Sequence, residues 1–158
     1  MPEVSDLMVF DYILCNTDRR VTKNNYAIRS CIKNCRPQDP QPKPGHPMFV
    51  HIDQGSSFYK KTGPEGNPLT GIPDRPNRFC RGFRKTTAKR VIDMSSKKSR
   101  HHTLWDNLKK RVPDHIIKHV GRDHVKAAQD RLDLLAQHLT ETCPKHFSEE
   151  EIHMFDNA

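Results

Sequence analysis

Two aspartates in this chain follow apolar stretches and precede polar turn residues. Asp18 ends the stretch FDYILCNTD, and Asp53 ends MFVHID, which is typical of a short strand. Phosphoryl transfer needs one carboxylate beside the attacking hydroxyl and a second on the divalent metal that bridges the nucleotide phosphates. Gly55 would let the backbone turn tightly under those phosphates. Because Asp and Gly are ordinary turn residues, only the pair in this order favours a phosphoryl-transfer site.

A helix before Asp18 and a strand before Asp53 are expected to position these two aspartates. A first helix is predicted over 5–15 with Ser5–Asp6 as its cap, and a strand over 48–52. Residues 36–47 are rich in proline, which excludes regular structure there. The fold class is therefore expected to be mainly α with a short β hairpin or strand.

The second half of the chain carries the clearer helical patterns. Thr86 or Thr87 is expected to cap one helix, a weaker helix includes 104–108, and Pro113 begins a short one that Gly121 closes. The last helix is expected to start at Asp123. Its apolar positions recur every three or four residues, at Val125, Ala128, Leu132, Leu135, Leu139 and Cys143.

Positive charge is concentrated in one part of this 158-residue chain, whose formal net charge is +8. Residues 75–111 contain thirteen Lys or Arg against Asp93 and Asp106. Such a stretch attracts nucleic acid, nucleotides, acidic proteins or sulfated glycans. The chain has no homeodomain, zinc-finger, bZIP or RNP signature, so nucleic acid is not the expected partner. A solvated face of a helical domain is the simpler interpretation.

Five cysteines leave the redox state open: Cys15, Cys31, Cys35, Cys80 and Cys143. The spacing of Cys31 and Cys35 is one residue longer than that of a common zinc knuckle. A zinc site there would need His46 or His51 at irregular spacing, which makes zinc the weakest interpretation. The alternatives are buried thiols, or two disulfides with one thiol left over.

The first residues indicate neither a signal peptide nor a membrane span, because they include acidic side chains and lack a basic region. On that basis alone the chain would be cytosolic. The opening also resembles a helix from the interior of a domain, so a fragment of a longer protein is the competing expectation.

Four stretches together resemble the atypical secretory-pathway kinases, the family of four-jointed and the Golgi casein kinase. FDYILCNTDRR is similar to the catalytic loop D-[YF]-[LI]-x-x-N-x-D-R, and VHIDQGSSF is similar to the metal-binding loop. RFCRGFRKTTAKRV and DRLDLLAQHLTETC resemble two later segments of the family. The four stretches occur in the same order as in the family, and the resemblance spans residues from Val4 to Cys143. It favours the four-jointed branch, with the Golgi casein-kinase branch close.

The resemblance implies a role for individual residues of the two loops. Asp18 would be the catalytic aspartate, while Asn16 and Arg19 would shape the catalytic loop. Asp53 would bind Mn or Mg at the phosphates of ATP, and Gly55 would contribute to the nucleotide site.

Other positions follow the family only in part. Cys80 and Cys143 match positions that are disulfide-linked in relatives, which implies an oxidising lumen. Gln54 stands where the family has Asn, and Lys23 stands at an often acidic position. Asn24 is therefore only a candidate for the second metal ligand.

The resemblance covers the C-terminal lobe of a kinase and not its N-lobe. A glycine-rich phosphate loop, a nucleotide-binding lysine and its partner glutamate are not found in this sequence. The expected organisation is a C-lobe over 1–146 with a tail over 147–158. The lobe would contain a catalytic loop at 10–25, the insertion at 36–47, a metal loop at 49–58 and a helical part at 84–143. Alone, it is expected to be inactive.

The function implied is transfer of the ATP γ-phosphate to Ser or Thr hydroxyls of secreted or cell-surface proteins, with cadherin-like domains as one substrate class. The full-length protein would be a type II membrane or secreted protein of the Golgi lumen. One alternative is a pseudokinase that activates a partner kinase, and another is a basic nucleic-acid- or glycan-binding domain. No membrane span is expected in this stretch.

Overall fold

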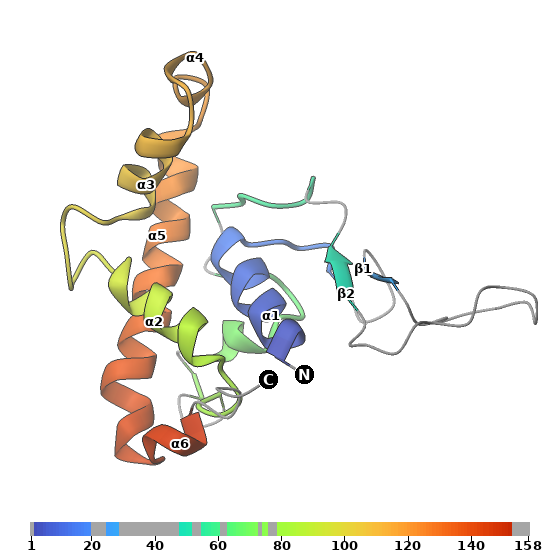
Figure 1. Cartoon of the computed structure of the whole chain (residues 1–158), viewed down its shortest axis with the longest axis vertical. Helices are drawn as coiled ribbons and strands as arrows, with labels where there is room; N and C mark the ends of the chain where they lie inside the picture. Colours follow the sequence, from blue (N-terminus) through green and yellow to red (C-terminus); the bar gives the residue numbers. More distant parts are fainter. Residues whose placement is uncertain are drawn as a thin grey trace, which may run out of the picture. The chain divides into compact units, whose positions relative to one another are not determined.

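The computed structural model describes residues 2–19, 25–28, 48–51, 55–60, 63–72, 74–75 and 79–152. The chain forms two compact units, one of residues 1–17 with 56–158 and the other of residues 18–55. The first unit is helical and the second contains two strands (Figure 1). The prediction of a mainly α chain is confirmed.

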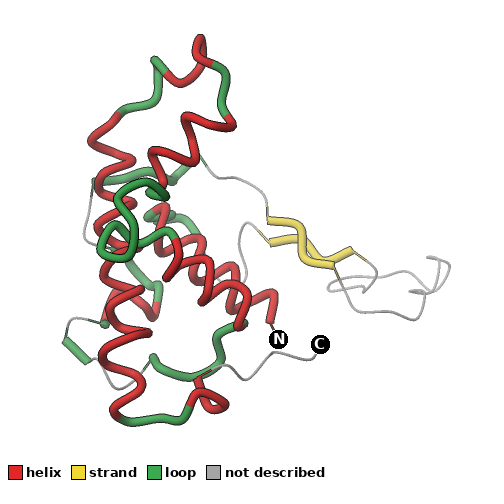
Figure 2. Tube along the Cα trace, turned by 60° about the vertical axis from the view of Figure 1, so that its left-hand side comes forward, coloured by secondary structure: helices red, strands yellow, loops and turns green. Residues whose placement is uncertain are grey.

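The helical unit is assembled around α5 (Arg122–Gln137), the longest helix of the described chain. It contacts α1 (Pro2–Leu14), α2 (Lys85–Asp93) and α3 (Leu104–Arg111), as Figures 1 and 2 show. All apolar positions predicted for the last helix are buried: Val125, Ala128, Leu132 and Leu135 within α5, and Leu139 and Cys143 beyond its end. Burial of this stripe removes apolar surface from water and is the main force that holds the unit together.

The start of α1 differs from the prediction. The helix begins at Pro2, so Ser5 and Asp6 lie inside it rather than at its cap. Asp6 instead receives a 2.6 Å hydrogen bond from Thr87 Oγ1 and forms a 3.2 Å ion pair with Arg84. The acidic side chain therefore joins α1 to the start of α2.

The predicted cap of α2 is also wrong, because the helix begins before the predicted cap residues. Its N-cap is Arg84, which makes no side-chain cap, and Thr86 and Thr87 both lie within the helix. Thr87 donates its hydroxyl hydrogen to Asp6 on a distant helix. A threonine near a helix start is a cap only if its backbone is extended, and sequence does not reveal that.

The next two helices begin close to where the pattern predicts. Thr103 caps α3 in a capping box with Asp106, and Pro113 precedes α4 (Asp114–Ile117). The prediction that Gly121 closes α4 is wrong, because α4 ends at Ile117 and Gly121 is the N-cap of α5. Asp123 is therefore a first-turn residue of α5 and not the predicted cap. A carboxylate in the first turn is still favourable, since it faces the positive end of the helix dipole.

Beyond Gln137 the helix changes its winding without stopping. A π-helical segment, η3 (His138–Thr142), leads into η4 (Cys143–Lys145) and then α6 (Glu149–Ile152). Ile152 is buried, and its carbonyl oxygen accepts a 3.1 Å hydrogen bond from the Phe83 N–H. Residues 147–152, which were assigned to a tail, thus pack onto the helical unit.

In the described part of the second unit, β1 (Asn25–Ile28) pairs antiparallel with β2 (Met48–His51). Tyr26 pairs with Val50, and Ala27 pairs with Phe49. The strand predicted over 48–52 is confirmed at residues 48–51, and Ile52 lies outside the described residues. The proline-rich insertion at 36–47 lies outside the described residues.

Candidate functional site

The helix that precedes Asp18 ends in a specific backbone motif. The Cys15 N–H donates to Tyr12 O at 3.1 Å, and the Asn16 N–H donates to Asp11 O at 2.9 Å. This pair of bonds is a Schellman motif, and it requires a left-handed residue after the last helical one. Cys15 occupies that position with a φ of 55°, where glycine is usual. The chain therefore turns sharply out of α1 at a strained residue.

A buried side-chain pair holds the same turn from inside. Asn16 Nδ2 donates a 3.1 Å hydrogen bond to Asp11 Oδ1, and both residues are 2% exposed. Burying these polar groups is tolerated because they satisfy one another. The Asn16 side chain is bonded to the preceding helix and not directed to solvent, and its part in a catalytic loop stays a prediction.

A buried arginine on α5 fixes the end of α1 from the other side. Arg131 Nε donates to the Ile13 carbonyl oxygen at 2.9 Å, and Nη1 donates to the Tyr59 carbonyl oxygen at 3.2 Å. These bonds satisfy one of the last carbonyl groups of α1, which have no partner within the helix. Burial lowers the pKa of Arg131 from its ordinary value and raises the pKa of neighbouring Tyr12 to about 12.

The segments on either side of residues 18–55 are bonded to each other. The Thr17 N–H donates to Ser56 O at 3.0 Å, and the Phe58 N–H donates to Leu14 O at 2.6 Å. Phe58 also has a positive φ, of 65°. Strained backbone outside glycine persists only where the surroundings enforce it, and it is concentrated at functional sites. Two such residues, Cys15 and Phe58, lie in segments that these bonds join.

The predicted catalytic and metal-binding residues are only partly within the described chain. Asp18 and Arg19 are partly exposed, and Gly55 is exposed in a turn. Asp53, Gln54 and Asn24 lie outside the described residues. The pairing of Asp18 with Asp53 around a metal therefore stays a prediction. Carboxylate oxygens are nonetheless the ligands that Mg²⁺ and Mn²⁺ prefer.

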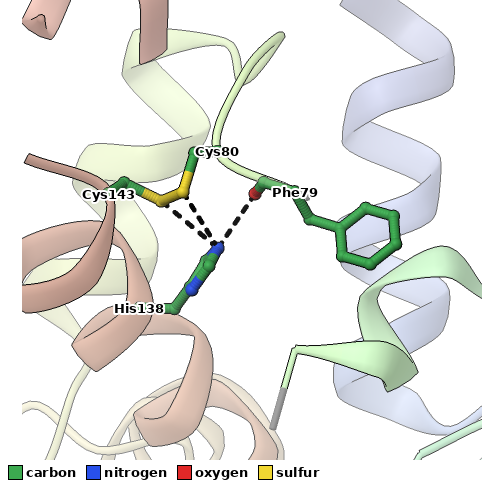
Figure 3. The surroundings of a disulfide bond; sticks show 4 residues. All are labelled: Phe79, Cys80, His138 and Cys143. Carbon is green, nitrogen blue, oxygen red and sulfur yellow. Dashed lines mark hydrogen bonds between the residues drawn. A yellow bond between two sulfur atoms is a disulfide. The ribbon is translucent and has the colours of Figure 1, made fainter. Parts of the chain in front are cut away.

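The structure places a second chemical cluster far from this turn in sequence. Cys80 and Cys143 form a disulfide with an S–S distance of 2.13 Å (Figure 3). His138 Nε2 lies 3.2 Å from Cys143 Sγ, 3.5 Å from Cys80 Sγ and 3.0 Å from the Phe79 carbonyl oxygen. Burial lowers the pKa of His138 and outweighs the opposing effect of the Phe79 hydrogen bond, so the surroundings favour the neutral imidazole.

Sequence reasoning missed Asp11, Arg131 and His138 as structural organisers. The sequence did hint that Arg131 and His138 are buried. Each is a polar residue beside an apolar position of the last helical pattern, where an exposed charge is not expected. A polar residue in an apolar stripe must find a partner when it is buried. The sequence does not name that partner.

Part of the positive charge in residues 75–111 is compensated locally. Asp93 pairs with Lys89 at 2.7 Å and with Lys98 at 2.5 Å, and hydrogen bonds from these lysines lower its pKa to about 2. Lys109 pairs with Asp106 at 3.3 Å. These exposed pairs support the interpretation of the stretch as a solvated face of the helical unit.

Within the described part of the chain, no helix is both long enough and apolar enough to cross a bilayer. Comparison with protein-family models, with curated proteins and with solved structures found no match to this chain. The function of this chain must therefore be inferred from its own residues and from the sequence resemblance.

Proposed function

We propose that this chain is the C-terminal catalytic lobe, of an atypical protein-kinase-like fold, from a secretory-pathway kinase. The enzyme would transfer the γ-phosphate of ATP to Ser or Thr hydroxyls of secreted or cell-surface proteins. The observation that supports this most directly is the end of α1. Buried bonds from Asn16 and Arg131 hold that end in one conformation two residues before Asp18. Phosphoryl transfer depends mainly on such positioning.

Each loop residue has a definite task in this proposal. Asp18 accepts the proton of the attacking hydroxyl and orients its oxygen, while Arg19 and Asn16 keep the loop in shape. Asp53, with Asn24 as a second candidate, holds Mn²⁺ or Mg²⁺. When bound, the metal neutralises the charge of the ATP phosphates and orients them. Gly55 allows the backbone to approach the nucleotide.

The disulfide supports the compartment that the proposal requires. A cross-link between Cys80 and Cys143 persists in the Golgi lumen or outside the cell and is rare in the cytosol. Such a compartment contains extracellular proteins in transit, which would be the acceptors. Cadherin-like domains are the acceptor class that the four-jointed resemblance suggests.

The test uses the full-length gene product, purified from the secretory pathway of cultured cells. We expect Mn²⁺-dependent phosphate transfer from radiolabelled ATP to secreted acceptor proteins, and a fall of at least about 10³-fold in kcat for Asp18→Asn. Asp53→Asn should abolish the Mn²⁺-dependent phosphate transfer, because it removes the proposed metal ligand. Asp74→Asn changes an exposed aspartate and is the matched control. Full activity in Asp18→Asn would contradict the proposal.

A pseudokinase that activates a partner kinase is the second candidate, and Lys23 and Gln54 favour it because both depart from the family pattern. Such a protein would transfer no phosphate itself. It would raise the activity of a co-purified kinase, and this effect would survive Asp18→Asn. The two proposals therefore predict opposite results for the same variant.

A further inference from the structure

One group of metal-ligating side chains stands out in the described part of the chain, and the kinase proposal does not use it. Cys80, His138 and Cys143 are all buried, and their ligand atoms lie within 4.8 Å of one another. We propose that, once the disulfide is reduced, these three residues bind one zinc ion. Disulfide and zinc would then be alternative cross-links between the segment before α2 and the end of α5.

The position of the imidazole matches that of a zinc ligand. Zinc binds sulfur at about 2.3 Å and nitrogen at about 2.0–2.1 Å, which in tetrahedral geometry separates the two ligand atoms by roughly 3.6 Å. His138 Nε2 lies 3.2 Å from one cysteine sulfur and 3.5 Å from the other. Cleavage of the disulfide frees the sulfur atoms to move apart, and the histidine needs only a small adjustment.

The π-helical segment explains how His138 and Cys143 come to face the same point. Residues five apart in an α-helix differ by about 140° around the axis, so their side chains diverge. In η3 the Cys143 N–H instead bonds to the His138 carbonyl oxygen, and this i to i+5 bond stacks the two residues. π-helical turns are rare and are frequently found at functional sites.

The charge and the polar neighbours of the cluster also suit zinc. Two thiolates balance the charge of Zn²⁺, so the site stays neutral as a buried site requires. The Phe79 carbonyl oxygen, which accepts the Nε2 hydrogen bond in the disulfide form, is directed at the same point (Figure 3). In the zinc form, this oxygen or a water molecule takes the fourth position.

The donor set selects zinc over the metals expected at the kinase site. Thiolate and imidazole ligands favour zinc, whereas Mg²⁺ and Mn²⁺ prefer oxygen. Nδ1 of His138 has no hydrogen-bond partner among the described residues. Because an outer hydrogen bond usually supports a histidine ligand, we expect affinity about 10–100-fold below that of a fully supported structural site.

The exchange between the two forms balances in electrons and protons. A dithiol reductant supplies two electrons and two protons, which cleave the S–S bond and give two cysteine thiols, and the reductant becomes a disulfide. Zinc then displaces one proton from each thiol and remains Zn²⁺ throughout. Metal binding is therefore expected to release protons and to weaken as pH falls.

The test is a cobalt titration of the reduced chain with Cys31→Ser and Cys35→Ser, which remove the other closely spaced cysteine pair. Co²⁺ is the probe, because tetrahedral thiolate coordination produces intense visible bands. We expect one Co²⁺ per chain, displaced by Zn²⁺, and no such spectrum from the oxidised chain. His138→Gln should weaken binding at least about tenfold. His124→Gln, at an exposed histidine, is the matched control and should bind normally.

A second measurement needs no substitution in the cluster. Alkylation of the reduced chain is followed by mass spectrometry with and without Zn²⁺, and zinc should slow the reaction of Cys80 and Cys143 but not that of Cys15. Equal alkylation rates with and without zinc, or a cobalt spectrum unchanged in His138→Gln, would overturn the proposal. A failure here leaves the kinase proposal intact, because the phosphate-transfer assay uses the disulfide form.

Discussion

At the scale of single residues, buried polar groups organise this protein more than its charged surface does. Asp11, Asn16 and Arg131 are each at most 3% exposed, and each forms a hydrogen bond with a specific partner. Removing one partner of such a pair leaves the other buried and unsatisfied, which costs about 1–3 kcal/mol. The exposed ion pairs of Lys89 and Lys98 contribute far less.

Tyr12 is expected to titrate abnormally late because its burial disfavours the phenolate. Its pKa is raised from 10.0 to about 12. Between these pH values the tyrosine is ionised in the unfolded chain but not in the folded one, so the free energy of unfolding falls as pH rises from 10 towards 12. A spectrophotometric titration of the phenolate band should show a component near pH 12. Tyr12→Phe should remove this component, whereas Tyr59→Phe, at an exposed tyrosine, should leave it in place.

At position 15 a glycine should give a more stable chain than an alanine, which reverses the usual order of these two residues. Its φ of 55° lies in the left-handed region, where a Cβ costs about 1 kcal/mol, and both substitutions remove the same thiol. We expect Cys15→Gly to be more stable than Cys15→Ala by about 1 kcal/mol in urea unfolding. An alanine variant equal to or more stable than the glycine variant would show that the Schellman turn is not retained.

At the scale of elements, helix starts depend on which residue has an extended backbone. The α3 helix contains no buried residue, so its capping box carries an unusually large share of its stability. The α2 helix has no side-chain cap but buries Ala88 and Val91 against the core. Packing thus stabilises α2 without a side-chain cap, whereas α3 combines its capping box with a partly buried Leu104 that packs against the core.

The capping residue of α3 offers a direct comparison. Thr103→Ala removes the hydroxyl that accepts the Asp106 N–H bond and should destabilise the chain by about 1 kcal/mol. Thr86→Ala, at an exposed site inside α2, should have almost no effect. Thermal unfolding followed by circular dichroism measures both. Equal losses would mean that Thr86 caps α2 after all.

At the scale of the whole molecule, one covalent cross-link closes most of the helical unit. The Cys80–Cys143 disulfide joins positions 63 residues apart and encloses α2, α3, α4 and α5. Closing such a long loop restricts the unfolded chain far more than the folded one, and this difference stabilises the fold.

Loss of this disulfide should therefore be costly. The loop-closure relation with 63 residues predicts about 4 kcal/mol of destabilisation for Cys80→Ser with Cys143→Ser. The measurement is the urea midpoint under non-reducing conditions in the presence of a chelator, which keeps zinc from replacing the cross-link. The unsubstituted chain plus reductant should show the same loss. An unchanged midpoint in both cases would show that the bond does not constrain the unfolded state.

Part of this structure was predictable because local sequence reports which face of a segment is buried. The period of α5, the strand at 48–51 and the short helix after Pro113 were all expected. The caps predicted at Ser5–Asp6, at Thr86 or Thr87, and at Asp123 were wrong, since capping depends on backbone angles that neighbouring packing decides. Of the candidate site, Asp11, Asn16 and Asp18 were indicated by the loop pattern, but the bond between Asn16 and Asp11 and the part played by Arg131 were not.

The sequence by itself determined where the chain is helical and which residues must leave water, because periodicity and apolar burial are local properties. Only the tertiary structure decided that Arg131 meets the Ile13 carbonyl, 118 residues away, and that His138 meets Cys80. A buried polar group needs a hydrogen-bond partner, and the sequence alone offers many residues that could serve. The packing of α1 and of the segment before α2 against α5 and η3 makes the choice.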